Sequence, residues 1–184
     1  MLLRPYVLAG ALALTAGVAN AAPFSYDYVE GGYGEVDRGD SLFIGGSSSL
    51  DKHLYVLGSA YALDFPGDVN GMYVEGGLGY HVPLAPKADL FATGQLLYAN
   101  LNHVGKDDDD LGAIARVGVR VMPVDKLEFE GSLALSSNDF LVDDGIGISA
   151  SARYYFQPQL SGAIGVSSDT ELDGVFLSAR YNFK

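Results

Sequence analysis

Along most of this chain, apolar residues occupy every second position. Between Ile146 and Phe156, for example, Ile, Ala, Tyr and Phe alternate with Gly, Ser, Arg and Tyr. Because neighbouring residues of a β-strand point to opposite faces, this pattern predicts a strand with one apolar and one polar face. Hydrophobic residues make up 48% of the chain, yet no long apolar run follows the N-terminal segment. This combination is typical of a transmembrane barrel, in which one strand face meets lipid and the other meets the lumen.

Turn signals divide the chain into candidate strands. They lie at 26–36, 41–50, 53–63, 71–82, 88–102, 111–122, 126–136, 145–156, 159–168 and 174–183. We therefore predict an all-β fold, an antiparallel up-and-down transmembrane β-barrel of ten strands, with eight as the alternative if one hairpin is misread. An even number of strands places both chain ends on the periplasmic side.

The connections between these strands fall into two chemical classes. The predicted periplasmic turns are short and contain Pro or Lys; they lie at 51–52, 83–87, 123–126 and 157–159. The predicted external loops are also short, and every one carries acid; they lie at 36–40, 64–70, 103–110, 137–144 and 168–173. Asp is itself a turn residue, but its preference for alternate turns supports this topology.

Ionisable residues lie on the polar faces of the predicted strands, in equal numbers of acids and arginines. They are Glu30, Glu75, Glu128, Glu130, Arg116, Arg120, Arg153 and Arg180. Charges inside a narrow barrel are costly unless they pair, and Arg pairs carboxylates in fork geometry. We therefore expect an ion-pair network that fills the lumen, and we favour a plugged barrel over an open porin. The same charges are expected to be structural and not catalytic.

Two strands give a less clear pattern, whereas the apolar faces of the strands at 71–82, 111–122, 126–136, 145–156 and 174–183 carry no charge. The strand at 53–63 allows either face outward, and Asp27 would face lipid if Glu30 faces the lumen, so the embedded part is expected to start after Asp27. Outward aromatic residues at periplasmic strand ends predict an interfacial girdle. They are Tyr80, Tyr154, Phe156, Tyr181 and Phe183.

The N-terminal segment has the features of a secretion signal. Arg4 precedes a short apolar stretch at 7–18, and Ala19-Asn20-Ala21 matches a cleavage site. We expect residues 1–21 to be a signal peptide and residues 22–184 to form the barrel in a bacterial outer membrane. Expected partners are outer-membrane lipid, lipopolysaccharide and the assembly machinery. The net charge of −12 argues against nucleic acid as a partner.

Three features of the predicted external loops are candidate sites. Arg38-Gly39-Asp40 is an adhesion-type tripeptide, but Gly and Asp are ordinary turn residues. The acidic run at 107–110 lacks the spacing of a calcium loop. His103 could join Ser136, Ser137 and Asp139 in a catalytic group, although no nucleophile motif is present. We expect solvated loops in each case, and no enzyme activity, metal or cofactor.

Two segments resemble a known family. Residues 24–33 (FSYDYVEGGY), and Gly79 to Leu84 followed by Ala88 to Leu90, are similar to a small, porin-like outer-membrane barrel family of gammaproteobacteria. One branch of this family has been described as a sulfation-dependent quorum-sensing factor. The resemblance implies that Tyr26 corresponds to the tyrosine proposed for modification. An ordinary aromatic residue at the periplasmic rim explains Tyr26 as well.

The C-terminus resembles the outer-membrane assembly signal. Tyr181 and Phe183 match its paired aromatic residues and Ser178 its small residue, while Lys184 replaces the usual terminal Phe. Three functions remain open at this point. The first is a structural or surface-interaction barrel with a charge-filled lumen and short acidic loops. The alternatives are a narrow passive pore and the precursor of a secreted quorum-sensing or elicitor signal.

Overall fold

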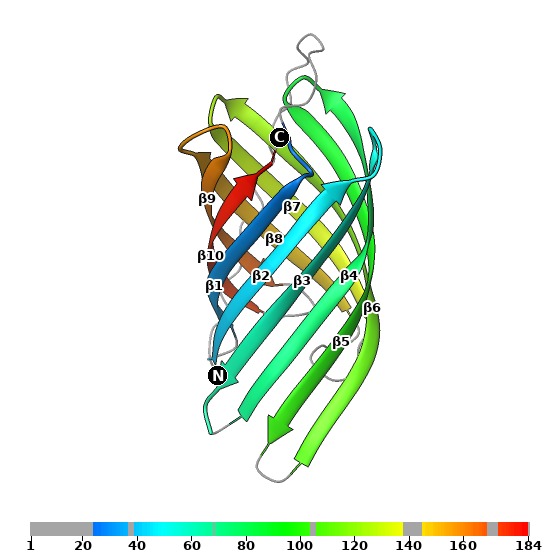
Figure 1. Ribbon diagram of the computed structural model, residues 1–184, viewed down its shortest axis with the longest axis vertical. Coiled ribbons are helices and arrows are strands. Elements are labelled where there is room, and N and C mark those ends of the chain that lie inside the picture. The colour runs from blue at the N-terminus through cyan, green and yellow to red at the C-terminus, as the bar shows by residue number, and fades with distance from the viewer. Residues whose placement is uncertain are drawn as a thin grey trace.

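A computed structural model describes residues 24–36, 39–67, 69–103, 106–137, 145–168 and 173–183. The strands are β1 (Tyr28–Val36), β2 (Gly39–Ser49), β3 (Leu54–Phe65), β4 (Val69–Ala85), β5 (Ala88–His103), β6 (Lys106–Val124), β7 (Leu127–Ser137), β8 (Gly145–Tyr155), β9 (Leu160–Ser168) and β10 (Asp173–Asn182). Each strand pairs with its neighbours in sequence, and β1 pairs with β10, so the sheet closes into one antiparallel barrel (Figure 1). The predicted barrel of ten strands is confirmed. Among the described residues there is no helix of the length and hydrophobicity that a membrane span needs.

The barrel has a turn end and a loop end. The turn end holds the short connections β2–β3, β4–β5, β6–β7 and β8–β9, together with the start of β1 and the end of β10. There the Phe183 N–H donates a 2.9 Å hydrogen bond to the Asp27 carbonyl. At the loop end, β5 and β6 extend beyond the other strands, which is the lower end in Figure 1. The barrel wall is therefore taller on the β5–β6 side.

The predicted external loop at 103–110 is wrong. β6 begins at Lys106, and Asp107 to Asp110 pair with residues 99–102 of β5. The run Asp107 to Asp110 was predicted as a loop only because Asp is common in turns. This hairpin projects beyond the other strands, and its Asp109 side chain is exposed while the backbone continues the ladder.

Two predicted turns are shorter than expected because strands continue past a proline. The β4–β5 ladder shifts register between Pro83 and Ala85, and the β6–β7 ladder shifts between Val121 and Val124, on either side of Pro123. Proline has no N–H to donate, so each strand bulges there and then resumes pairing. The β6–β7 turn closes at Lys126, which has a φ of 69°. Positive φ is what a tight hairpin turn requires.

The two faces of the wall differ as the alternation predicted. Outward side chains are apolar and well exposed, reaching 75% at Leu111 and 73% at Leu96. The aromatic residues expected in the girdle, Tyr80, Tyr154, Phe156, Tyr181 and Phe183, all lie outward near the turn end and are about half exposed or more. Because water-exposed apolar surface of this extent is unfavourable, the exterior suits contact with lipid.

Glycines on the inner wall make room for aromatic rings. A Cβ at Gly79 would overlap the ring of Tyr55, and a Cβ at Gly118 would overlap the ring of Phe91. Each glycine lies on the strand next to its ring, so the ring occupies the space of the missing side chain. This packing settles the orientation of β3: Tyr55 and Leu63 are buried inside and Val56 is exposed outside.

Candidate functional site in the barrel lumen

The segment just before β1 lies inside the mouth of the barrel at the turn end. β1 begins at Tyr28, two residues later than the predicted strand. Phe24 and Tyr26 are buried and form one apolar cluster with Tyr55, Met122 and Tyr155. Residues 24–27 thereby occupy space that an open pore would leave to water. We call them the entry segment.

Tyr26 is fixed by contacts on two sides. Its ring stacks on His81 with centroids 3.9 Å apart, and its hydroxyl donates a 3.0 Å hydrogen bond to Asp89 Oδ2. Asp89 is fully buried, and His81 Nδ1 also lies 3.0 Å from its Oδ2. Burial raises the pKa of the Tyr26 hydroxyl, which therefore stays protonated as the donor.

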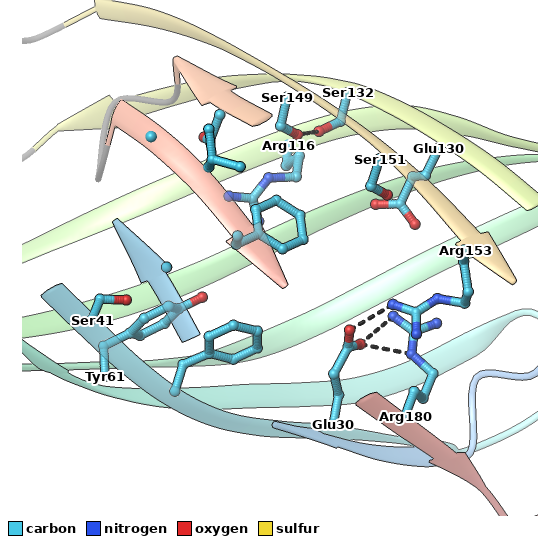
Figure 2. A pocket seen from close by; sticks show the side chains of 16 residues that line it. Glu30, Ser41, Tyr61, Arg116, Glu130, Ser132, Ser149, Ser151, Arg153 and Arg180 are labelled. Carbon is cyan, nitrogen blue, oxygen red and sulfur yellow. Dashed lines mark hydrogen bonds and ion pairs between the residues drawn. The ribbon is translucent and has the colours of Figure 1, made fainter. Parts of the chain in front are cut away.

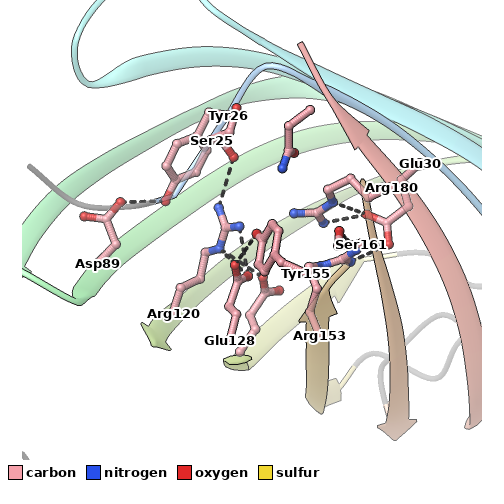
Figure 3. A network of polar contacts seen from close by, with 12 residues as sticks. Ser25, Tyr26, Glu30, Asp89, Arg120, Glu128, Arg153, Tyr155, Ser161 and Arg180 are labelled. Carbon is pink, nitrogen blue, oxygen red and sulfur yellow. Dashed lines mark hydrogen bonds and ion pairs between the residues drawn. The ribbon is translucent and has the colours of Figure 1, made fainter. Parts of the chain in front are cut away.

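Arg120 links the entry segment to the far wall (Figure 3). It forms a 2.9 Å ion pair with Glu128 and lies 3.6 Å from Glu130. Its guanidinium also donates to the Ser25 carbonyl at 3.4 Å and lies over the ring of Phe24. The buried Arg120 guanidinium thus contacts the Ser25 backbone, the Phe24 ring and two carboxylates.

A second group of charges lies further toward the middle of the barrel. Glu30 accepts from Arg153 at 2.5 Å and from Arg180 at 2.5 and 2.7 Å. Ser178 donates to the same carboxylate, while Arg153 also donates to Ser161. Each carboxylate oxygen therefore serves one arginine: Oε1 accepts from Arg153, and Oε2 accepts two N–H groups of Arg180.

Six of the eight predicted lumen charges meet in these ion pairs: Glu30 with Arg153 and Arg180, and Arg120 with Glu128 and Glu130. Glu75 instead accepts hydrogen bonds from Ser59 at 2.5 Å and Tyr73 at 3.0 Å. Glu75 and Arg116 line a cavity whose wall also includes Glu30. The paired charges therefore form two groups, one around Glu30 and one around Arg120.

Two cavities lie in the lumen next to these charged groups. The larger, of about 240 Å³, runs from Glu30 and Arg180 to loop-end residues of β9 and β10 (Figure 2). Its wall includes Arg116, Glu130 and five serines, of which Ser132 and Ser149 are hydrogen-bonded at 2.7 Å. The smaller cavity, of about 160 Å³, shares Glu30, Phe43, Tyr61 and Arg116 with it.

Sequence reasoning missed the entry segment, Asp89 and the inward rings of Phe43 and Tyr61. A glycine on the neighbouring strand could have indicated an inward ring: a Cβ at Gly32 would overlap Phe43. No comparable signal marks the entry segment, because it lies outside the alternating pattern.

The remaining predicted site residues are distributed as follows. Ser178 points inward to Glu30, whereas Tyr181 and Phe183 are exposed outside, in edge-to-face contact with each other. Ser136 is buried and Ser137 exposed. Residues 1–23, Arg38 and Asp139, and the side chains of His103, Asp107 and Asp108, lie outside what the structure describes. Within the described ranges, no group of three His, Cys, Asp or Glu could hold a metal.

Comparison with known proteins supports the fold alone. No protein-family model matches this chain, and no curated protein sequence matches it either. Among solved structures it is similar to the KdgM porin, with a TM-score of 0.52 and 9% identity over 85% of this chain and 99% of that one. The NanC porin aligns with a TM-score of 0.46 and 11% identity, over 86% of this chain and 99% of that one. The chain therefore has the fold of a small porin barrel.

Proposed function

We propose that this protein is a narrow passive pore of the bacterial outer membrane, closed at its turn end in the conformation described. The lumen carries the argument: a polar cavity of about 240 Å³ extends from the middle of the barrel to the loop end. Between this cavity and the turn end, the entry segment and the ion pairs of Arg120 fill the lumen. The apolar exterior, the porin fold and the secretion-signal pattern support the outer-membrane location.

The cavity wall favours small anionic solutes. Arg116, Arg153 and Arg180 line it, against the two carboxylates Glu30 and Glu130. Glu30 is already held by two of the arginines. This cavity wall therefore has one arginine more than it has carboxylates, and such a local excess of positive charge attracts anions, because the apolar surroundings screen charge poorly.

Passage through the pore requires the entry segment to move. Asp27 anchors the end of this segment, because its carbonyl accepts from the Phe183 N–H and its carboxylate accepts from Ser48 and Ser49. Apart from ring packing, few bonds hold residues 24–26 to the barrel wall: the Tyr26 hydroxyl to Asp89, Ser47 to the Tyr26 carbonyl, and Arg120 to the Ser25 carbonyl. These three residues precede β1 and are not part of the ladder, so they can leave the mouth without breaking strand pairing. The strands would remain paired all the way round the barrel while the lumen opens to solute.

Solute release from liposomes tests the proposal. The wild-type barrel is expected to release a small anion such as gluconate slowly, and a cation of similar size, such as N-methylglucamine, more slowly still. A Phe24→Ser, Tyr26→Ser variant should release gluconate at least about tenfold faster, since it removes both rings that fill the mouth. A Tyr154→Ser, Phe156→Ser variant, changed on the outer face, is the control and should behave as wild type.

The structural or surface-interaction role is the second candidate, and the same closed mouth favours it. In that case neither variant releases solute although both are folded and heat-modifiable. No contact among the described residues supports the role of signalling precursor. It would require Tyr26 to leave a buried site and β1 to be removed from between β2 and β10, which exposes two strand edges.

A further inference from the structure

Aromatic rings face the larger cavity from one side of the barrel. Phe43 stacks on Tyr61 with centroids 5.5 Å apart, and Phe176 meets Phe43 edge to face at 6.5 Å. All three line the cavity and are only partly buried. The rings at the turn end, by contrast, are packed out of reach of water. Apolar surface left open inside a polar lumen gains free energy when an apolar partner covers it.

The wall formed by β6, β7 and β8 has the opposite chemistry. Arg116 points into the lumen beside the hydroxyls of Ser132 and Ser149, while Ser151 lies beside Glu130 on the same wall (Figure 2). A guanidinium has several N–H donors in a planar fork, so it can donate to a ligand carboxylate while it keeps its contacts within the protein. The hydroxyls add further donors at the same wall.

We propose that this cavity is a binding site for a monocyclic aromatic carboxylate, with the carboxylate on Arg116 and the ring against Phe43 and Phe176. A cation would meet Arg116 with the wrong charge, and a purely polar anion would leave the rings uncovered. The volume of about 240 Å³ suits a single ring and not an extended chain. The inference rests on the proposed pore only for the route by which the solute arrives.

Equilibrium binding to the folded barrel in detergent micelles tests the site, with 4-hydroxybenzoate as the probe. Benzyl alcohol supplies a ring without the charge, and gluconate supplies the charge without a ring. We expect 4-hydroxybenzoate to bind at least about tenfold more tightly than either, since only it uses both walls. Equal binding of all three, or no binding at millimolar concentration, would overturn the proposal.

Variants assign the two halves of the site. Arg116→Gln should weaken 4-hydroxybenzoate at least about tenfold and leave benzyl alcohol unchanged, and Arg116→Lys should restore part of the loss. Phe176→Leu should weaken both aromatic probes. Phe129→Leu, on the outer face of β7, is the matched control and should change neither. Equal effects of Phe176→Leu and Phe129→Leu would contradict the site.

Two outcomes separate this inference from the pore itself. Binding in micelles needs no conduction, so a barrel that binds 4-hydroxybenzoate but releases no solute from liposomes refutes only the pore. A barrel that conducts but binds none of the probes refutes only the site. Should Arg116→Gln fail to fold, as judged by heat-modifiable mobility, Phe43→Leu takes its place, with weaker binding of both aromatic probes expected.

Discussion

The Tyr26 hydroxyl donates a 3.0 Å hydrogen bond to Asp89 Oδ2, although the two residues are 63 positions apart in sequence. Tyr26 lies before the first strand, and Asp89 is the second residue of β5. This bond joins the entry segment to the barrel wall. The entry segment is therefore part of the folded barrel mouth.

Tyr26→Phe should destabilise the barrel by about 1–3 kcal/mol, because it leaves the fully buried Asp89 with one donor fewer while keeping the ring. Urea unfolding in lipid vesicles measures the effect. Tyr154→Phe, on the exposed outer face, should change the unfolding free energy by less than about 0.5 kcal/mol. Equal effects of the two substitutions would show that the Asp89 contact contributes little.

Glu30→Gln should be more damaging, at about 3–5 kcal/mol, since it leaves Arg153 and Arg180 buried without their carboxylate. The matched control is Asp125→Asn, which breaks the exposed 2.7 Å pair with Lys87 and should have no measurable effect. The same unfolding assay applies. A Glu30→Gln barrel as stable as wild type would mean that water already solvates these arginines.

Gly118→Val should destabilise the barrel by about 1–3 kcal/mol through overpacking. Its Cβ would overlap the Phe91 ring and lie 2.7 Å from the Gly131 carbonyl oxygen. Gly94→Val is the control: it faces outward, and nothing lies within 4 Å of an added Cβ. Urea unfolding of the two variants in lipid vesicles checks the prediction. It fails if Gly94→Val lowers the unfolding free energy as much as Gly118→Val does.

Asp51 in the β2–β3 turn should titrate below an ordinary aspartate. Hydrogen bonds from the His53 and Leu54 N–H groups lower the pKa of its carboxyl from the ordinary value of 3.8. Since the folded pKa is the lower one, its contribution to stability is complete above the unfolded pKa and is lost as pH falls through the folded pKa. Carbon NMR of the carboxyl measures this pKa in micelles.

Asp51→Asn provides the control for that titration. The amide oxygen can accept the same two backbone hydrogen bonds, so the turn should persist without any titration at this position. An Asp51 carboxyl that titrates at its ordinary value would indicate that the two hydrogen bonds do not persist in solution.

Alternation carried the sequence-based prediction of the fold. In β4, β6, β7, β8 and β10 it placed the outward and inward side chains correctly, because the range predicted for each of these strands has an apolar outer face. β3 could not be oriented, since Tyr55, Leu63 and their neighbours make its inner face apolar as well. A narrow lumen filled partly by rings removes the contrast on which the pattern depends.

The lumen itself was predictable in composition but not in pairing. Alternation placed Glu30 and Arg180 on the inner face, but which carboxylate meets which arginine depends on strand stagger. Asp89 illustrates the limit: its turn-like sequence context gave no sign that the side chain would be fully buried beneath Tyr26. Contacts across the lumen join residues far apart in sequence, and no local pattern encodes them.

Single-channel recording in planar bilayers tests the central claim, a porin-fold barrel closed by its entry segment, most directly. Wild-type protein should give rare, brief openings, and the Phe24→Ser, Tyr26→Ser variant should give sustained unitary currents with a reversal potential that indicates anion preference. Silence from a folded variant would contradict the account, and so would large steady currents from the wild type.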